Sequence, residues 1–235
     1  MKNGSIGATG IVLLASLFAS FTAAAAERGF YIGGFYGQTK TSLDAEPFGQ
    51  IAFNVYDSFF FTPETSSFTL DEKDSGYGFL GGYRWLRNLA FEAGYVDLGK
   101  YRYRDQSTGF FSDPDSEDTF DAALGQTLNV EESGIMLSAL GILPLSYRTE
   151  LYARGGVLFS SSEISGSVYD EVDRVNLGSD SDSDVDWIVG VGASFTVAEI
   201  YALRLEYQRI FDLGNKDLWG ESDVDVVSLG FTVTF

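Results

Sequence analysis

The chain contains no cysteine and no histidine, and it has far fewer basic than acidic residues. Without cysteine, no disulfide framework, thiol chemistry or cysteine-ligated zinc site is available. The absence of histidine removes the commonest general base and metal ligand, which weighs against an enzyme. Fifteen Lys and Arg residues against 34 Asp and Glu residues give a net charge of −19. A surface so acidic is poorly suited to the phosphates of nucleic acids.

Long apolar runs are also missing once the first 26 residues are set aside. Residues 1–26 have a basic start at Lys2, an apolar run over 11–21 and three alanines before Glu27, which are the features of a cleaved signal peptide. The run is shorter than the roughly 20 residues that a spanning helix needs. We therefore prefer cleavage to a membrane anchor, and we expect one exported domain over residues 27–235 with no spanning helix.

The last stretch of the chain, residues 223–235, alternates between apolar residues and small or polar ones. One face carries five large apolar side chains, Val227, Leu229, Phe231, Val233 and Phe235. In a transmembrane β-barrel this pattern has a direct physical reason, because one face meets lipid and the other meets a polar interior. Twenty-seven glycines, thirteen tyrosines and twenty phenylalanines also suit a barrel wall with aromatic girdles.

Eight segments are interpreted as strands, and the connections between them alternate between long and short. The expected strands are 30–38, 76–84, 89–98, 133–142, 150–160, 187–196, 200–208 and 223–235. The four long connections, 39–74, 99–132, 160–186 and 209–225, hold 28 of the 34 acidic residues, which leaves the walls suited to hydrocarbon. The sequence predicts an all-β fold: an eight-stranded antiparallel up-and-down transmembrane β-barrel with long extracellular loops and short periplasmic turns.

One part of the first long connection is strongly apolar for a loop. It covers residues 51–61 and reads IAFNVYDSFFF. We favour a β-ribbon that extends the first hairpin above the membrane. Two alternatives stay open: residues 51–61 and 66–70 enter the wall of a ten-stranded barrel, or the apolar stretch is a partner-binding patch.

Four charged residues of the predicted strands share the inward-facing parity. Glu92 and Arg204 each lie between two apolar residues, so they point away from the lipid-facing side chains. Arg154 and Glu206 have the same parity. Because a lone buried charge is costly, we expect these four residues to be paired with one another. We interpret them as structural residues that fill the lumen, since an eight-stranded barrel is only wide enough for side chains.

Two acidic runs resemble cation sites only in part. The run SDSDSDVD at 179–186 alternates like the start of a calcium loop, but Val185 replaces the turn glycine and Val191 the closing glutamate. The other run comprises Asp113, Asp115, Glu117 and Asp118, with no recognisable ligand spacing. We expect solvated loops, with weak divalent-cation binding as the alternative. No catalytic residue, metal site or cofactor site is assigned.

Three short strings make the barrel pattern more specific: FEAGY at 91–95, RLEYQ at 204–208 and VSLGF at 227–231. Each is similar to a string in the corresponding strand of the OmpA transmembrane-domain family of small outer-membrane β-barrels, which the whole mature chain resembles. The resemblance implies a bacterial outer-membrane location and an interior ion pair between Glu92 and Arg204. A second interior Lys–Glu pair of that family falls at Ala139 and Ser194 here, so gating by exchange between two pairs is not expected.

The resemblance also implies a function and partners. Phe231, Val233 and Phe235 are expected to be the C-terminal signal for the barrel-assembly machinery. Outer-membrane lipid and lipopolysaccharide are expected to surround the barrel, and an extracellular ligand of the acidic loops is a further candidate partner. We expect a structural and surface-interaction role, in envelope integrity and loop-mediated contacts, with a plugged lumen. The alternative is a small-solute pore. Outer-membrane enzymes such as lipid A deacylases and omptin-type proteases rely on histidine, so no enzyme is expected.

Overall fold

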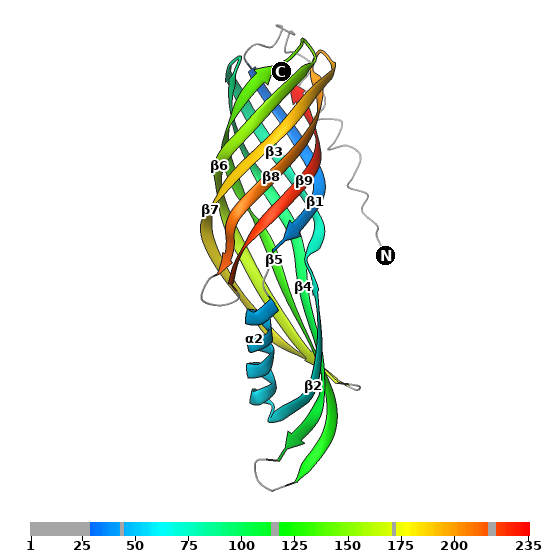
Figure 1. The fold of residues 1–235 in the computed structure, drawn as a ribbon. Helices are drawn as coiled ribbons and strands as arrows, with labels where there is room; N and C mark the ends of the chain where they lie inside the picture. Colours follow the sequence, from blue (N-terminus) through cyan, green and yellow to red (C-terminus); the bar gives the residue numbers. More distant parts are fainter. Residues whose placement is uncertain (1–28, 43–44, 114–117, 171–172, 216–219) are drawn as a thin grey trace, which may run out of the picture.

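A computed structural model describes residues 29–42, 45–113, 118–170, 173–215 and 220–235 (Figure 1). The signal peptide predicted at 1–26 lies outside these residues. The described residues form one helix and nine strands: β1 (Gly29–Thr41), α2 (Ala45–Ser58), β2 (Phe61–Asp71), β3 (Lys73–Leu86), β4 (Leu89–Ser112), β5 (Thr119–Pro144), β6 (Thr149–Tyr169), β7 (Arg174–Ala198), β8 (Tyr201–Asn215) and β9 (Gly220–Thr234).

Eight of these strands close into a ring. The sheet order is β2-β4-β3-β1-β9-β8-β7-β6-β5, and an additional β4–β5 pairing closes it. Every pairing is antiparallel. β2 pairs only with the part of β4 from 102 to 111 and therefore stands outside the ring. The predicted eight-stranded up-and-down barrel is confirmed, and the ten-stranded alternative is wrong.

In the ring, apolar side chains face outward. On β4, Phe91 is 45% exposed whereas its neighbour Glu92 is 3% exposed. On β9, Leu229 and Phe231 are exposed whereas Ser228 and Thr232 are buried. A belt of exposed apolar and aromatic side chains is stable only in contact with lipid. Because roughly 9–11 residues of a tilted strand cross the hydrocarbon, the spanning part of β4 corresponds to about residues 89–97.

Strands β4 to β7 continue past the ring and form, with β2 and α2, a structure that we call the extension. It lies at the end of the molecule opposite the C-terminus (Figure 1). Residues 99–132 and 160–186 were predicted as loops, and this prediction is wrong for most of both ranges, which are strands. Alternation is present there, with Tyr101 and Tyr103 buried and Arg102 and Arg104 turned outward. The outward charges concealed the strand pattern in the sequence.

The β-ribbon predicted for residues 51–61 is also wrong, because most of that stretch belongs to α2. Phe48, Ala52 and Tyr56 recur every four residues and are buried together, which is the period of a helix face. Pro47 lies in the first turn, where a missing N–H does no harm. This face packs on the inner side of β4, β5 and β6, against Tyr101, Tyr103, Leu128, Val130, Leu124 and Val168. In the part of the chain that the structure describes, no helix is long and apolar enough to cross a membrane.

Candidate functional site: the lumen of the barrel

Strands β4, β6 and β8 bring the four predicted interior charges together. Arg204 Nη1 lies 2.6 Å from Glu92 Oε1, and Arg154 Nη2 lies 2.7 Å from Glu92 Oε2. Arg154 Nε lies 2.5 Å from Glu206 Oε1, and Arg204 Nη2 lies 3.6 Å from Glu206 Oε2. Each carboxylate thus contacts both guanidinium groups. We call these four residues the charge tier, which carries no net charge.

Hydrogen bonds from neutral side chains complete the charge tier. The Tyr31 hydroxyl donates to Glu92 Oε1 at 2.7 Å, and the Tyr152 hydroxyl donates to Glu206 Oε2 at 2.9 Å. The guanidinium carbon of Arg204 also lies 4.5 Å from the centroid of the Tyr152 ring, a cation–π contact. Partners of this kind offset the desolvation cost of buried charges.

Two glycines make room for these tyrosines. A Cβ at Gly82 would lie 2.3 Å from Tyr31 Cζ, and a Cβ at Gly192 would lie 2.4 Å from Tyr152 Cζ. Both distances are far inside van der Waals contact. Glycine at these wall positions therefore lets a large ring lie across the lumen, as expected where a close approach is required.

Two features of the lumen's polar groups differ from the sequence analysis. Ser138, rather than Ala139, is the inward residue of β5 at the charge tier, and its Oγ accepts a 2.6 Å hydrogen bond from Arg154 Nη1. A further ion pair, missed from the sequence, joins Arg84 Nη2 to Glu150 Oε1 at 2.8 Å. It lies near the ends of β3 and β6, beside the short turns. Its members share the inward parity, but their position at strand ends hid them.

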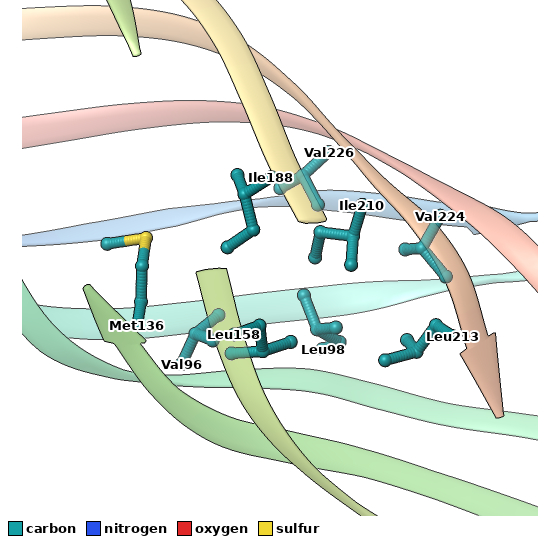
Figure 2. Close-up of a cluster of buried hydrophobic side chains, with 9 residues drawn as sticks. All are labelled: Val96, Leu98, Met136, Leu158, Ile188, Ile210, Leu213, Val224 and Val226. Carbon is teal, nitrogen blue, oxygen red and sulfur yellow. The ribbon is translucent and has the colours of Figure 1, made fainter. Parts of the chain in front are cut away.

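Next to the charge tier, on the side of the extension, the lumen is filled by apolar side chains. Figure 2 shows the nine residues of this apolar tier, which come from β4 to β9: Val96, Leu98, Met136, Leu158, Ile188, Ile210, Leu213, Val224 and Val226. All are buried. The polar interior predicted from the sequence is therefore wrong for this part of the lumen. The signal of the tier in the sequence is an apolar residue at an inward position directly beside an outward one, at 95–96 and 226–227.

A buried acid lies beside the end of the apolar tier that faces the extension, outside the spanning segments. Glu132 is 4% exposed, and Ser162 donates a 2.5 Å hydrogen bond to its Oε2. Burial, which penalises the charged form, raises the pKa of Glu132 to about 8, and Asp186 adds a smaller upward contribution. Among the described residues, no Lys or Arg forms an ion pair with Glu132.

The acidic runs do not gather into a metal site within the described residues. No group of three or more acidic residues there is placed to hold a metal ion. The run at 179–186 is part of the extended strand β7, a geometry that cannot wrap around a cation as a calcium loop does. In the other run, Asp115 and Glu117 lie outside the described residues.

The three C-terminal apolar residues lie at the seam between β1 and β9. Phe231 is exposed and stacks on Tyr201 of β8, with ring centroids 5.6 Å apart. The backbone N–H of Phe235 donates to the carbonyl of Phe30 at 2.9 Å, which extends the pairing to the last residue. Val233 lies between them in β9 and is half-buried.

The eight-stranded ring agrees with the family that the sequence matches. The family model described as the OmpA-like transmembrane domain matches residues 25–235. The chain belongs to this family. It is accordingly a β-barrel of the bacterial outer membrane.

Individual relatives of this OmpA-like chain are distant. Outer membrane protein A of Yersinia pseudotuberculosis is 27% identical over 162 residues, which are 68% of this chain and 40% of that protein. The chain thus spans less than half the length of this relative. Among solved structures, Neisserial surface protein A is 15% identical with a TM-score of 0.48, covering 88% of this chain and 97% of that one. The N-terminal β-barrel domain of Pseudomonas aeruginosa OprF is 11% identical with a TM-score of 0.43, covering 88% and 98%.

Proposed function

We propose that this protein is a structural and surface-interaction barrel whose lumen is closed. The observation that carries the proposal is the stacking of two tiers across one narrow interior: the charge tier and then the apolar tier. Every member of the charge tier is engaged with another member or with a tyrosine or serine. The interior of an eight-stranded barrel is only wide enough for side chains. Here the charge tier fills one level of that interior and the apolar tier fills the next.

The alternative function, a small-solute pore, requires a continuous polar path. The apolar tier interrupts such a path. A polar solute or ion would lose its water between the nine apolar side chains, and these side chains offer no hydrogen bond or charge to offset the cost. The charge tier could conduct only if its ion pairs exchanged partners. The nearest uncharged interior groups of that tier, Ser138 and the two tyrosines, offer no second charge for such an exchange.

The extension supports the surface-interaction part of the proposal. Its strands and α2 enclose their own apolar core, so it stands above the membrane as a folded platform rather than as separate loops. Phe53 on α2 and Phe60 after it are each more than half exposed. Exposed aromatic side chains on a rigid support are typical of contact surfaces.

Partners at the membrane follow from the same proposal. Outer-membrane lipid and lipopolysaccharide surround the apolar belt of the ring. Phe231, Val233 and Phe235 act as the recognition signal for the barrel-assembly machinery, supported by their place on the strand that completes the ring. The acidic edge of β7 is a candidate contact for an extracellular ligand. We further propose that the chain is not an enzyme, since it lacks histidine and its lumen charges are engaged with one another.

Single-channel recording in planar bilayers tests the closed lumen. We expect the full chain to insert without stable openings. Replacing Met136 and Leu158 with serine should raise the frequency of openings, because it introduces polar groups into the apolar tier. Ile135→Ser, on the lipid-facing side beside Met136, is the matched control and should leave the recording unchanged. Stable openings in most insertions of the unaltered protein would overturn the proposal in favour of the pore.

A further inference from the structure

Two lysines of adjacent strands lie side by side on the outer face of the barrel. Lys40 of β1 and Lys73 of β3 are direct cross-strand partners, and both are exposed. Side chains of such partners leave the sheet with Cβ atoms about 5 Å apart, and like charges in this arrangement are destabilising. The pair is notable in a chain with a net charge of −19, where acidic neighbours are abundant.

No acid of the described residues forms an ion pair with either lysine. Asp225 of β9 is the partner of Lys40 on its other side. Its carboxylate is already engaged, because it accepts hydrogen bonds from Arg209 Nε at 2.7 Å, Arg209 Nη2 at 2.8 Å and the Tyr207 hydroxyl at 2.6 Å. Asp74, next to Lys73 in sequence, accepts the backbone N–H of Lys100 at 2.6 Å.

Further cations lie beside Lys73, where β4 changes its partner from β3 to β2. The fork encloses a cleft of about 460 Å³ lined by Lys73, Lys100 and Arg102, with Leu70, Asp71, Glu72 and Asp74. Lys100 forms an ion pair with Glu131, and Arg102 Nε donates to Asn129 Oδ1 at 2.9 Å. Asp71 lies 3.8 Å from Arg104. The two lysines thus adjoin a cleft in which both acidic and basic groups are present.

The height of the lysine pair relative to the membrane follows from the strand register. Tyr36 and Tyr77 are also cross-strand partners, four residues before Lys40 and four after Lys73, and both are exposed. Tyrosines of this kind mark the level of the lipid headgroups. Four residues of a tilted strand rise roughly 10 Å, so the ammonium groups stand above the hydrocarbon, where the outer-leaflet headgroups carry their phosphates.

We propose that Lys40 and Lys73 form a binding site for a phosphate group of lipopolysaccharide, with Arg102 at its flank. A bound phosphate would neutralise the like-charged pair. It would also supply acceptors for the two ammonium groups, which form no ion pair within the described residues. Beyond β4 the rim turns acidic: Glu131 of β5 and Glu163 of β6 are cross-strand partners, and both are exposed. The proposal deepens the lipopolysaccharide partnership of the proposed function and assigns it to one side of the barrel.

The test is the binding of fluorescent diphosphoryl lipid A to the full chain refolded in phosphatidylcholine vesicles. Two basic side chains near an anionic surface contribute additively, so Lys40→Gln with Lys73→Gln should weaken binding by about thirtyfold. The matched control is Arg148→Gln, a cation in the short turn at the other end of the barrel. It should bind lipid A as the unaltered protein does, and a gel-shift assay of folding should show all variants folded.

Three outcomes would overturn the site. The double variant could bind as tightly as the unaltered protein, the Arg148→Gln control could lose as much affinity, or neither protein could prefer diphosphoryl lipid A to its dephosphorylated form. If inorganic phosphate displaced lipid A at equal concentration, the lysines would hold free phosphate and the lipid assignment would be wrong. Channel recordings of the double variant separate the two proposals, because the lysines lie outside the lumen and their loss should not open it.

Discussion

The part of β4 inside the ring and the part in the extension have opposite patterns. Inside the ring, Phe91 faces outward to lipid and Glu92 faces the interior; in the extension, Arg102 faces outward to water and Tyr103 faces the interior. The change occurs at the irregularity between Asp97 and Gly99, where one extra residue shifts the parity of the strand. The outer face of β4 thus meets lipid in the ring and water in the extension. The difference shows that the surroundings, rather than the strand itself, decide which face is apolar.

The two regions are consequently stabilised by different interactions. The ring has lipid outside and the charge tier and apolar tier inside. The extension has water outside, and its stability depends on the apolar contact between α2 and the sheet. Removing apolar contacts from the extension should therefore leave the ring folded, and altering the charge tier should act on the ring.

The largest effect is expected from Phe48→Ala in α2. Phe48 is 2% exposed and stacks on Tyr103 with ring centroids 5.7 Å apart. Deleting a buried phenylalanine side chain costs about 3–5 kcal/mol, and we expect that loss in the local stability of the extension. Amide hydrogen exchange should accelerate at 101–105 and 128–130 but not in the ring. Phe53→Ala, on the exposed side of α2, is the control. Equal acceleration in the ring would show that the two regions unfold as one unit.

A smaller effect, dependent on pH, is expected from Glu132→Gln. Because burial raises the pKa of Glu132 to about 8, the neutral form favours the folded state. Its contribution to stability is complete below the ordinary pKa of about 4.5 and is lost as the pH rises through 8. The unaltered protein should thus lose about 2.5 kcal/mol relative to the glutamine variant between pH 6 and pH 9. Urea unfolding at both values measures this, with the exposed Glu163→Gln as control. A constant difference between the two pH values would contradict it.

The smallest effect is expected from Asp180→Asn together with Asp182→Asn in β7. These residues lie on the exposed edge of the extension, where substitutions usually change stability by no more than about 0.5 kcal/mol. Calcium should change the unfolding midpoint of the variant and of the unaltered protein equally. Stabilisation by calcium of the unaltered protein alone would reveal a cation site in this run.

The ring could be predicted from the sequence because lipid imposes a simple rule on every spanning strand. All eight expected strands lie within those observed, except that Ile200 precedes β8 and Phe235 follows β9. The extension could not be predicted in the same way. The irregularity after Asp97 inverts the parity of β4, and the phenylalanines at 53, 59 and 60 hide the four-residue spacing of α2. Pro63 also disguises β2, because proline usually marks a segment that is not a strand. Here it lies in an edge strand beside a register irregularity, where proline is tolerated.

In the lumen, the alternation of the strands was sufficient to predict the charge tier but not the apolar tier. The inward parity of Glu92, Arg154, Arg204 and Glu206 was sufficient to group them, because each lies among lipid-facing neighbours. The apolar tier was missed because Val96 and Val226 follow the parity of polar positions, where only the three-dimensional packing shows that they fill space. Ion pairs at strand ends, such as Arg84 with Glu150, need the turn geometry as well as the parity.

The central claim is that the four charges of the lumen act as one paired unit, and a double-mutant cycle on Glu92 and Arg204 tests it most directly. Their side chains meet at 2.6 Å with exposures of 0% and 8%. Removing one partner of a buried pair typically costs about 3–5 kcal/mol, whereas removing both costs less. We expect urea unfolding in lipid to show that Glu92→Ala and Arg204→Ala are each destabilising and that the double variant loses less than their sum, by about 1–3 kcal/mol. Strictly additive losses would contradict the account.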